Sequence, residues 1–409
     1  MDKQTIDRNM RILVLELFWA ALATGCYSFA SAYLIRLGGT NLQVSMLTSA
    51  AALVNALTSI PFALFLERRT NRWRWVVASL WILRLGHIGL VLAPFLPSYR
   101  PEAIVLLLLL VNIPVALFNT GWLPMFADLV PLSHRARLLS ARNMTMNITV
   151  MITTFVMGRW LDTMAFPYNY QLMFIFAVLM TSISSILVGR LVIPEAANGP
   201  RSSQAPEPYP SLRVMFRQQR PFVNIAINTL IFNIAIWMAT PLQPIYFVRE
   251  LRASDGWLGI WLSLISAGAI LGNLLWPRLI NLKGYGWVLA RATVLSAAYY
   301  FLIALFPNLS LILAFALLFG LISPGVDISH FNTLLEVCDP QRRIIYMSMF
   351  VTLMNTGFFL SAVGAAPLLD AFGARTLLLA LGTLRLIGGL LFTLNPVHAQ
   401  SLEQRIGTA

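Results

Sequence analysis

The feature that most constrains this chain is a series of twelve long apolar runs, each with the length of a membrane-spanning helix. A helix needs about 20 mostly apolar residues to cross a bilayer. The runs are continuous rather than alternating, which excludes a transmembrane β-barrel. Only 11% of the 409 residues are charged, against about 25% in a soluble domain. We therefore predict an all-α polytopic membrane protein. The predicted spans are residues 12–36, 42–66, 74–96, 103–127, 140–161, 169–193, 221–248, 256–280, 286–306, 310–335, 344–369 and 375–395.

The longest break between apolar runs is residues 194–220. It contains five prolines together with Ser202 and Ser203. This composition predicts a linker. We expect an N-terminal six-helix half at residues 1–193, a cytoplasmic linker at 194–220 and a C-terminal six-helix half at 221–409.

Short internal repeats relate the two predicted halves. Tyr33-Leu34-Ile35-Arg36 ends the first run, and Tyr246-Phe247-Val248-Arg249 ends the seventh run, 213 positions later. Met146-Asn147 in the fifth run matches Met354-Asn355 in the eleventh, 208 positions later. A parallel duplication of six spans, which makes the halves pseudo-symmetric, is typical of transporters.

The basic residues predict the orientation of the spans. With the N-terminus in the cytoplasm, cytoplasmic segments hold 20 of the 29 Lys and Arg residues and the opposite side holds six. This bias predicts that both termini are cytoplasmic. The net charge of +13 therefore reflects membrane topology, and nucleic acid is not expected as a partner. No cluster of metal ligands and no phosphate-binding loop is found, so no cofactor or metal is expected.

Two predicted cytoplasmic loops carry a family resemblance. The loop after the second run reads Glu67-Arg68-Arg69-Thr70-Asn71-Arg72, and the fourth run is followed by Asp128-Leu129-Val130-Pro131 and then Arg135-Ala136-Arg137. Both resemble loops of bacterial members of the major facilitator superfamily. In that family, such charges form a cytoplasmic network that favours one state of the transport cycle. The resemblance implies a gating network of Glu67, Arg68, Arg72, Asp128, Arg135 and Arg137. The alternative is a basic loop that only sets topology.

The resemblance also implies a function. It predicts a secondary transporter that moves a small solute by alternating access, in a bilayer that we expect to be a bacterial plasma (inner) membrane. A solute or proton gradient would supply the energy, and we expect a monomer. In the family, spans 1, 4, 7 and 10 line the central cavity. The polar residues predicted to be substrate or proton sites are Asp327, His330, Asn119, Asn112, Asn228, Asn233, Gln243, Tyr27 and Ser31. Each amide or hydroxyl has an alternative role in hydrogen bonds between helices.

Asp327 is the acidic residue placed deepest in a predicted cavity-lining span. A carboxylate in hydrocarbon is costly, which makes it a candidate functional group. His330 follows three positions later on the same helical face. Two interpretations stay open for Asp327: a cavity or proton site, or an ion pair with Arg385, which lies at similar depth in the twelfth run.

Arg84 in the third predicted span is a second candidate for an intramembrane ion pair, with Glu16 in the first. Two functional alternatives to transport also remain at this point. One is a polytopic membrane enzyme that uses Asp327 and His330. The other is a sensor or scaffold that has the transporter fold but moves no solute.

Overall fold

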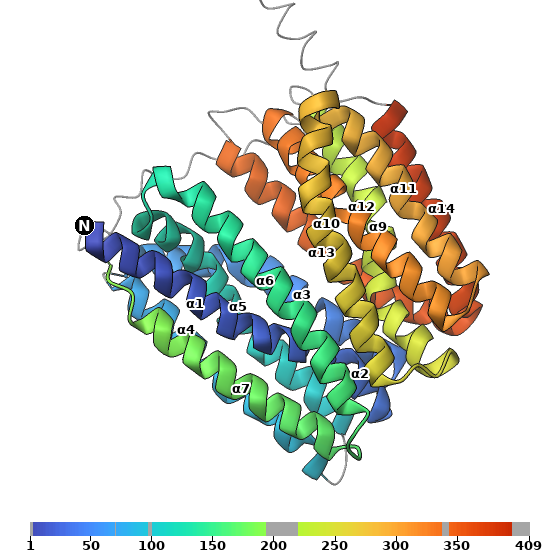
Figure 1. Ribbon diagram of the computed structural model, residues 1–409, viewed down its shortest axis with the longest axis horizontal. Coiled ribbons are helices and arrows are strands. Elements are labelled where there is room, and N and C mark those ends of the chain that lie inside the picture. The colour runs from blue at the N-terminus through green and yellow to red at the C-terminus, as the bar shows by residue number, and fades with distance from the viewer. Residues whose placement is uncertain (1–2, 70, 97–99, 194–219, 338–342, 395–409) are drawn as a thin grey trace, which may run out of the picture. The chain divides into compact units, whose positions relative to one another are not determined.

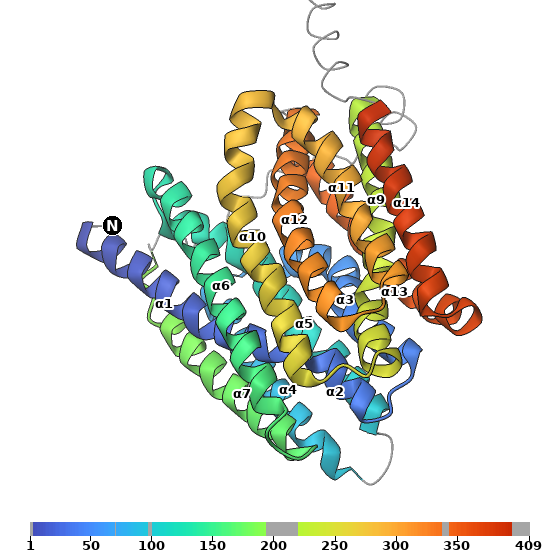
Figure 2. The same cartoon turned by 45° about the vertical axis from the view of Figure 1, so that its right-hand side comes forward.

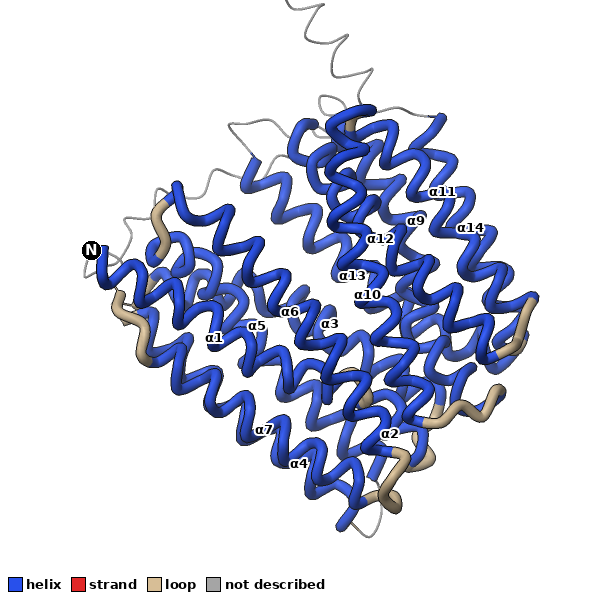
Figure 3. The backbone as a smooth tube through the Cα atoms, viewed as in Figure 1, coloured by secondary structure: helices blue, strands red, loops and turns tan. Residues whose placement is uncertain are grey.

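The computed structural model describes residues 3–69, 71–96, 100–193, 220–337 and 343–394, although the side chains of some of these residues, including Glu67 and Asp128, lie outside the description. Figure 3 shows that the described elements are helices joined by loops. Twelve long helices occupy the predicted spans, which confirms the all-α polytopic fold. Eleven of the described helices are long and apolar enough to cross a membrane. The cytoplasmic placement of the termini stays a prediction.

The chain forms two compact units. Unit 1 comprises the described part of residues 1–205 together with residues 252–263, and unit 2 comprises the described part of 206–251 and 264–409. The predicted linker, residues 194–220, lies almost wholly outside the described residues, so the predicted half boundaries stay a prediction. The helices of unit 1 are α1 (Lys3–Tyr27), α2 (Ala30–Arg36), α3 (Asn41–Glu67), α4 (Arg72–Leu92), the short 3-10 helix η1 (Ala93–Phe95), α5 (Arg100–Leu129), α6 (Leu132–Leu161) and α7 (Tyr168–Gly189).

Local sequence explains where helices in unit 1 begin and end. The first predicted span is broken into α1 and α2 at Ser28 and Phe29, where the Phe29 N–H donates to the Cys26 carbonyl, three positions back, at 3.1 Å. The Ser28 hydroxyl and N–H both donate to the Thr24 carbonyl, at 2.9 and 3.1 Å. Thr40 caps α3 through a reciprocal pair of hydrogen bonds with Gln43, of 3.2 and 2.7 Å, which satisfies two free donors. Gly38, at φ 86°, supplies the left-handed turn before that cap.

The long helices of unit 1 pack against one another in a defined set of pairs. α1 packs against α6 and α7, α4 packs against α5 and α7, and α3 packs against α5; α1 and α7 run side by side in Figures 1 and 2. A buried cluster fills one end of the unit, with Leu13, Trp73, Leu129 and Val188 contributed by four helices. Burial of such apolar surface between helices fixes the framework that holds the polar groups described below.

The first residues of α10 (Asp255–Lys283) belong to unit 1 and pack against α6 through glycines. A Cβ atom built on Gly259 would lie 2.4 Å from the Thr154 carbonyl oxygen and 2.8 Å from the Gly158 Cα. Alongside, the Ser263 hydroxyl lies 2.9 Å from Thr154 Oγ1 and 2.8 Å from the Met151 carbonyl oxygen. We call this contact of Thr154, Gly158, Gly259 and Ser263 the α6–α10 seam. It is a backbone-to-backbone contact that only glycine permits.

Unit 2 contains the rest of α10 and five further long helices. They are α9 (Arg220–Ile245), which continues into the π-helix η3 (Tyr246–Glu250), α11 (Tyr285–Leu305), α12 (Leu309–Val337), α13 (Arg343–Phe372) and α14 (Ala374–Leu394). α11 packs against α12 and α14, and α9 packs against α13 and α14; α11 and α14 lie side by side in Figures 1 and 2. Glycines again allow close approach, since a Cβ on Gly320 of α12 would lie 2.2 Å from the Ile265 carbonyl oxygen of α10.

Candidate functional site

α12 is adapted to carry a proline in the turn before Asp327. Pro324 has no N–H, so the Gly320 carbonyl loses its usual donor. The Ser323 hydroxyl donates to that carbonyl at 3.2 Å. Trp276 Nε1 donates to the neighbouring Leu321 carbonyl at 2.7 Å. These side-chain bonds let α12 remain helical through Pro324 and position Asp327 one turn further along.

The Asp327 side chain is exposed and, among the described residues, has no hydrogen-bond or ion-pair partner. Arg385 attracts it electrostatically, but these two described side chains form no ion pair within 4.0 Å. Arg385 instead is buried, donates from Nε to Ser296 at 2.9 Å and lies 4.0 Å over the Phe232 ring. The direct Asp327–Arg385 pair, one of the two sequence interpretations, is therefore absent from this conformation, because Arg385 is turned into the packing of α9, α11 and α14.

His330 turns away from Asp327 and into the core of unit 2. Its Nε2 atom lies 2.6 Å from Thr229 Oγ1 on α9. Its ring lies 5.8 Å from that of Phe350 and 6.3 Å from that of Phe392. The structure thus places His330 in an aromatic packing site with its own hydroxyl partner. It does not join Asp327 and His330 through a hydrogen bond.

The remaining predicted cavity residues have varied environments. Asn112 donates to the Leu108 carbonyl of its own helix at 2.7 Å, and buried Asn228 donates to the Leu391 carbonyl of α14 at 3.5 Å. Asn119 on α5 is exposed and makes no hydrogen bond within the described part of the chain. Tyr27 stacks on His87 with ring centroids 4.3 Å apart. Ser31, Asn233 and Gln243 are half-buried, as are Asn112 and Tyr27.

The predicted Arg84–Glu16 pair is replaced by a different ion pair. Arg142 of α6 donates from Nη1 to Glu16 Oε1 at 2.7 Å and also bonds the Leu13 carbonyl. Ser184 donates to the other carboxylate oxygen at 3.1 Å. Arg84 is buried and bonds Ser185 at 3.2 Å. These two described side chains therefore form no direct ion pair in this conformation, in which Arg142 of α6 contacts the Glu16 carboxylate.

The predicted gating network is described only in part. The side chains of its two acids, Glu67 and Asp128, lie outside the described residues. Arg135 donates from Nε to the Val130 carbonyl at 2.9 Å, which closes the turn before α6. The side chains of Arg68 and Arg137 are exposed, and that of Arg72 is half-buried. The network itself stays a prediction.

One buried polar cluster of unit 1 is absent from the sequence-based candidates. Asp255, at the start of α10, is 4% exposed and accepts from Arg36 Nε at 3.0 Å and Nη2 at 2.9 Å. The Tyr170 hydroxyl of α7 donates to the same carboxylate oxygen at 2.7 Å. The neighbouring Ser254 donates to Asp162 at 2.9 Å. The repeat that ends in Arg36 and Arg249 is the sequence signal that singles out Arg36, but nothing in it identifies Asp255 as the partner.

Comparison with known proteins identifies the family. The model of the Major Facilitator Superfamily matches residues 13–257 and 225–406. Comparison with curated proteins gives no match.

Crystal structures of three transporters are similar at 13–14% sequence identity. A point mutant of the nucleoside transporter NupG has a TM-score of 0.71 with 14% identity, and the match covers 95% of this chain and 99% of that one. A bacterial homolog of the human lysosomal transporter Spinster, inward-facing and unoccupied, has a TM-score of 0.71 with 13% identity, and the match covers 98% of this chain and 99% of that one. A POT family transporter in complex with a thioalcohol-conjugated peptide has a TM-score of 0.74 with 14% identity over 95% and 96%.

The family match covers most of the chain and confirms the resemblance found in the loops. It also removes the enzyme alternative, because the superfamily consists of non-enzymatic transporters. The chain is an integral, multi-pass membrane protein and belongs to the major facilitator superfamily of secondary transporters.

Proposed function

We propose that this transporter moves a small polar or amphipathic solute by alternating access and that Asp327 couples the movement to protons. The observation that carries the proposal is the state of Asp327, an exposed carboxylate within the candidate span Leu309–Leu334. It has no ion-pair partner among the described residues. An ionisable group in such a span is costly and is retained mainly for function.

Protonation offers Asp327 a direct way to lower that cost. A neutral carboxylic acid is far cheaper than a carboxylate in a medium of low polarity. A partner-free acid can therefore bind and release a proton as the polarity around it changes during the transport cycle. His330 is not needed as a relay, since its ring is held by Thr229 and aromatic neighbours.

The chemistry of the solute follows from the polar groups near the expected cavity. Asn119 and Asn233 offer amides, which bind neutral polar groups, and Asp327 offers an acceptor. Nucleosides and short peptides are therefore suitable first probes, and the similar structures include a nucleoside transporter and a POT family transporter with a bound peptide conjugate. We expect a monomer in a bacterial plasma membrane, which is in keeping with the bacterial Spinster homolog.

The test uses the purified full-length chain in proteoliposomes. A thermal-shift screen of nucleosides and di- and tripeptides first selects a solute, because a ligand that binds the folded form raises its stability. Uptake of that solute is then measured with an inward proton gradient and, separately, by counterflow exchange without a gradient. Asp327→Asn should abolish gradient-driven uptake and preserve counterflow.

The matched control is Glu250→Gln, which removes an exposed carboxylate at the end of η3 and should leave both measurements at the wild-type level. Gradient-driven uptake that persists in Asp327→Asn would contradict proton coupling through this residue. Absence of any flux in the wild-type protein, for a solute that binds, would favour the sensor or scaffold alternative.

A further inference from the structure

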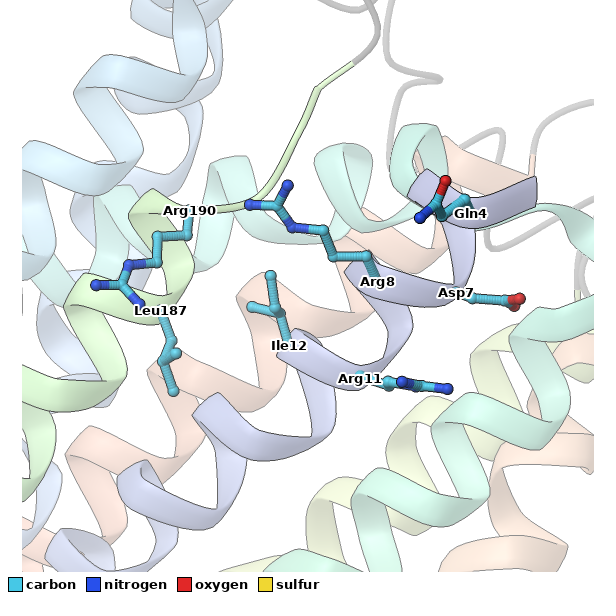
Figure 4. A pocket seen from close by; sticks show the side chains of 7 residues that line it. All are labelled: Gln4, Asp7, Arg8, Arg11, Ile12, Leu187 and Arg190. Carbon is cyan, nitrogen blue, oxygen red and sulfur yellow. The ribbon is translucent and has the colours of Figure 1, made fainter. Parts of the chain in front are cut away.

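A cavity of about 780 Å³ lies where the start of α1 meets the end of α7, in unit 1. Figure 4 shows the side chains that line it. Three of the lining residues are arginines, Arg8, Arg11 and Arg190, and one is the acid Asp7. None of these four forms an ion pair within the described part of the chain. The lining therefore carries a surplus of positive charge that nothing described neutralises.

The charges are sorted between two faces of α1. Arg8 and Ile12 are four positions apart and share one face, whereas Asp7 and Arg11 share the next. In Figure 4, Arg8 lies on the side of α1 that faces Arg190 and Leu187, and Asp7 and Arg11 point away from them. We call Arg8 and Arg190 the arginine pair: they line the cavity together with Ile12 and Leu187, and in Figure 4 the Arg8 side chain extends toward Arg190 whereas the Arg190 guanidinium points away from Arg8.

A buried amide ties together the two backbone segments that carry this pair. Asn9 is 0% exposed; its Nδ2 donates to the Val192 carbonyl at 2.8 Å, and its Oδ1 accepts from the Val192 N–H at 3.1 Å. The two bonds tie the chain that leaves α7 to the first turns of α1. Arg8 precedes Asn9 directly and Arg190 lies two residues before Val192, so the frame holds both arginines at the cavity.

We propose that Arg8 and Arg190 bind the headgroup phosphate of an anionic phospholipid, with Ile12 and Leu187 against the glycerol and the first acyl carbons. Guanidinium groups bind phosphate oxygens through paired hydrogen bonds. Basic pockets between helices on the cytoplasmic side of membrane proteins take lipid headgroups of this class, and this is the basic end that the loop charges predict to be cytoplasmic. The site is independent of the solute and of Asp327.

The experiment uses the full chain purified in a neutral maltoside detergent, with dioctanoyl-phosphatidylglycerol as the probe. Its apparent affinity is measured from the rise in Tm and from lipid retained in native mass spectra. Dioctanoyl-phosphatidylcholine and inorganic phosphate are titrated in parallel. Phosphatidylglycerol should stabilise the wild-type protein well beyond either comparator. Arg8→Gln/Arg190→Gln should weaken its binding about fivefold for each arginine, roughly thirtyfold for both.

Two further variants complete the test. Arg8→Lys/Arg190→Lys keeps the charge and should keep most of the effect of phosphatidylglycerol, which separates loss of binding from loss of folding. Arg278→Gln/Lys283→Gln removes two exposed charges of α10 and should bind like the wild type. The proposal is overturned if phosphatidylcholine stabilises as strongly as phosphatidylglycerol or if the double glutamine variant binds with wild-type affinity. An equal effect of inorganic phosphate would instead assign the site to a free anion and overturn the lipid.

Discussion

Arg142 donates from Nη1 to Glu16 at 2.7 Å and joins α6 to α1 across 126 positions of the sequence. Both side chains are at most 10% exposed. Removing one partner of a buried pair leaves a charge without compensation and typically costs about 3–5 kcal/mol. We expect Arg142→Gln to lower the free energy of unfolding by that order, and Glu16→Gln in the same chain to restore part of the loss.

Denaturant unfolding in detergent measures the effect, and Arg159→Gln, an exposed arginine of the same helix, is the control. A double variant no more stable than Arg142→Gln alone would show that the two side chains are not coupled.

The Asp255 cluster predicts that removal of the Tyr170 hydroxyl alone lowers the stability of the protein substantially. Tyr170→Phe deletes the hydroxyl that donates to Asp255 at 2.7 Å and leaves the ring in place. Hydrogen bonds to charged groups are worth about 1.5–3 kcal/mol, so we expect a loss of that size. Tyr168→Phe, two positions earlier and exposed, should cost less than about 0.5 kcal/mol. Equal stabilities of the two variants would rule out a structural role for the hydroxyl.

The Thr229–His330 contact predicts that a substitution at Thr229 lowers stability without changing the pH dependence of transport. Thr229→Val keeps the shape of the side chain but removes the partner of His330 Nε2, at about 1–3 kcal/mol for an unsatisfied buried group. The pH dependence of solute uptake should not change, because His330 is a packing residue rather than a relay. Thr240→Val, which loses only a bond to its own helix, is the stability control. A shifted pH profile in Thr229→Val would return His330 to the proton pathway.

The α6–α10 seam predicts that one methyl group is not tolerated. Gly259→Ala would place a Cβ 2.4 Å from the Thr154 carbonyl oxygen, whereas Gly364→Ala meets nothing within 4 Å. We expect Gly259→Ala to lower the Tm by several degrees, since overpacking costs about 1–3 kcal/mol. Gly364→Ala should leave the Tm unchanged or slightly raised. Differential scanning fluorimetry of both variants decides it, and matching melting curves would mean that the seam has room to adjust.

Most of the fold can be predicted from the sequence because the length and apolar composition of a segment decide whether it can span a bilayer, whatever its neighbours are. The spans follow from hydropathy alone, and a long described helix occupies each of them, although the first span is divided between α1 and α2 and the seventh between α9 and η3. Hydropathy is least informative for α6, which carries Thr149, Thr153 and Thr154 and is absent from the eleven apolar helices. The span predicted at residues 140–161 also begins later than the helix, since α6 runs without a break from Leu132.

The partners of the polar residues could not be predicted, because they depend on the rotation of each helix about its axis. Counting residues from the ends of spans gives similar depths for Asp327 and Arg385, but depth does not determine which neighbour each faces. Arg385 donates a hydrogen bond to Ser296 and lies over the Phe232 ring. The Arg36–Asp255 contact joins residues 219 positions apart, and the sequence around either residue does not predict the other as its partner.

The α6–α10 seam has a consequence for how easily it can come apart. Helices that interlock through long side chains must withdraw and reorder those side chains when they part, which changes their rotamer entropy. Gly158 and Gly259 have no rotamers, and the hydroxyls of Thr154 and Ser263 can turn to carbonyls of their own helices, Val150 and Gly259, at 2.9 and 2.7 Å. Each surface therefore carries its own substitute hydrogen bonds. Separating and re-forming such a contact therefore changes the side-chain entropy very little.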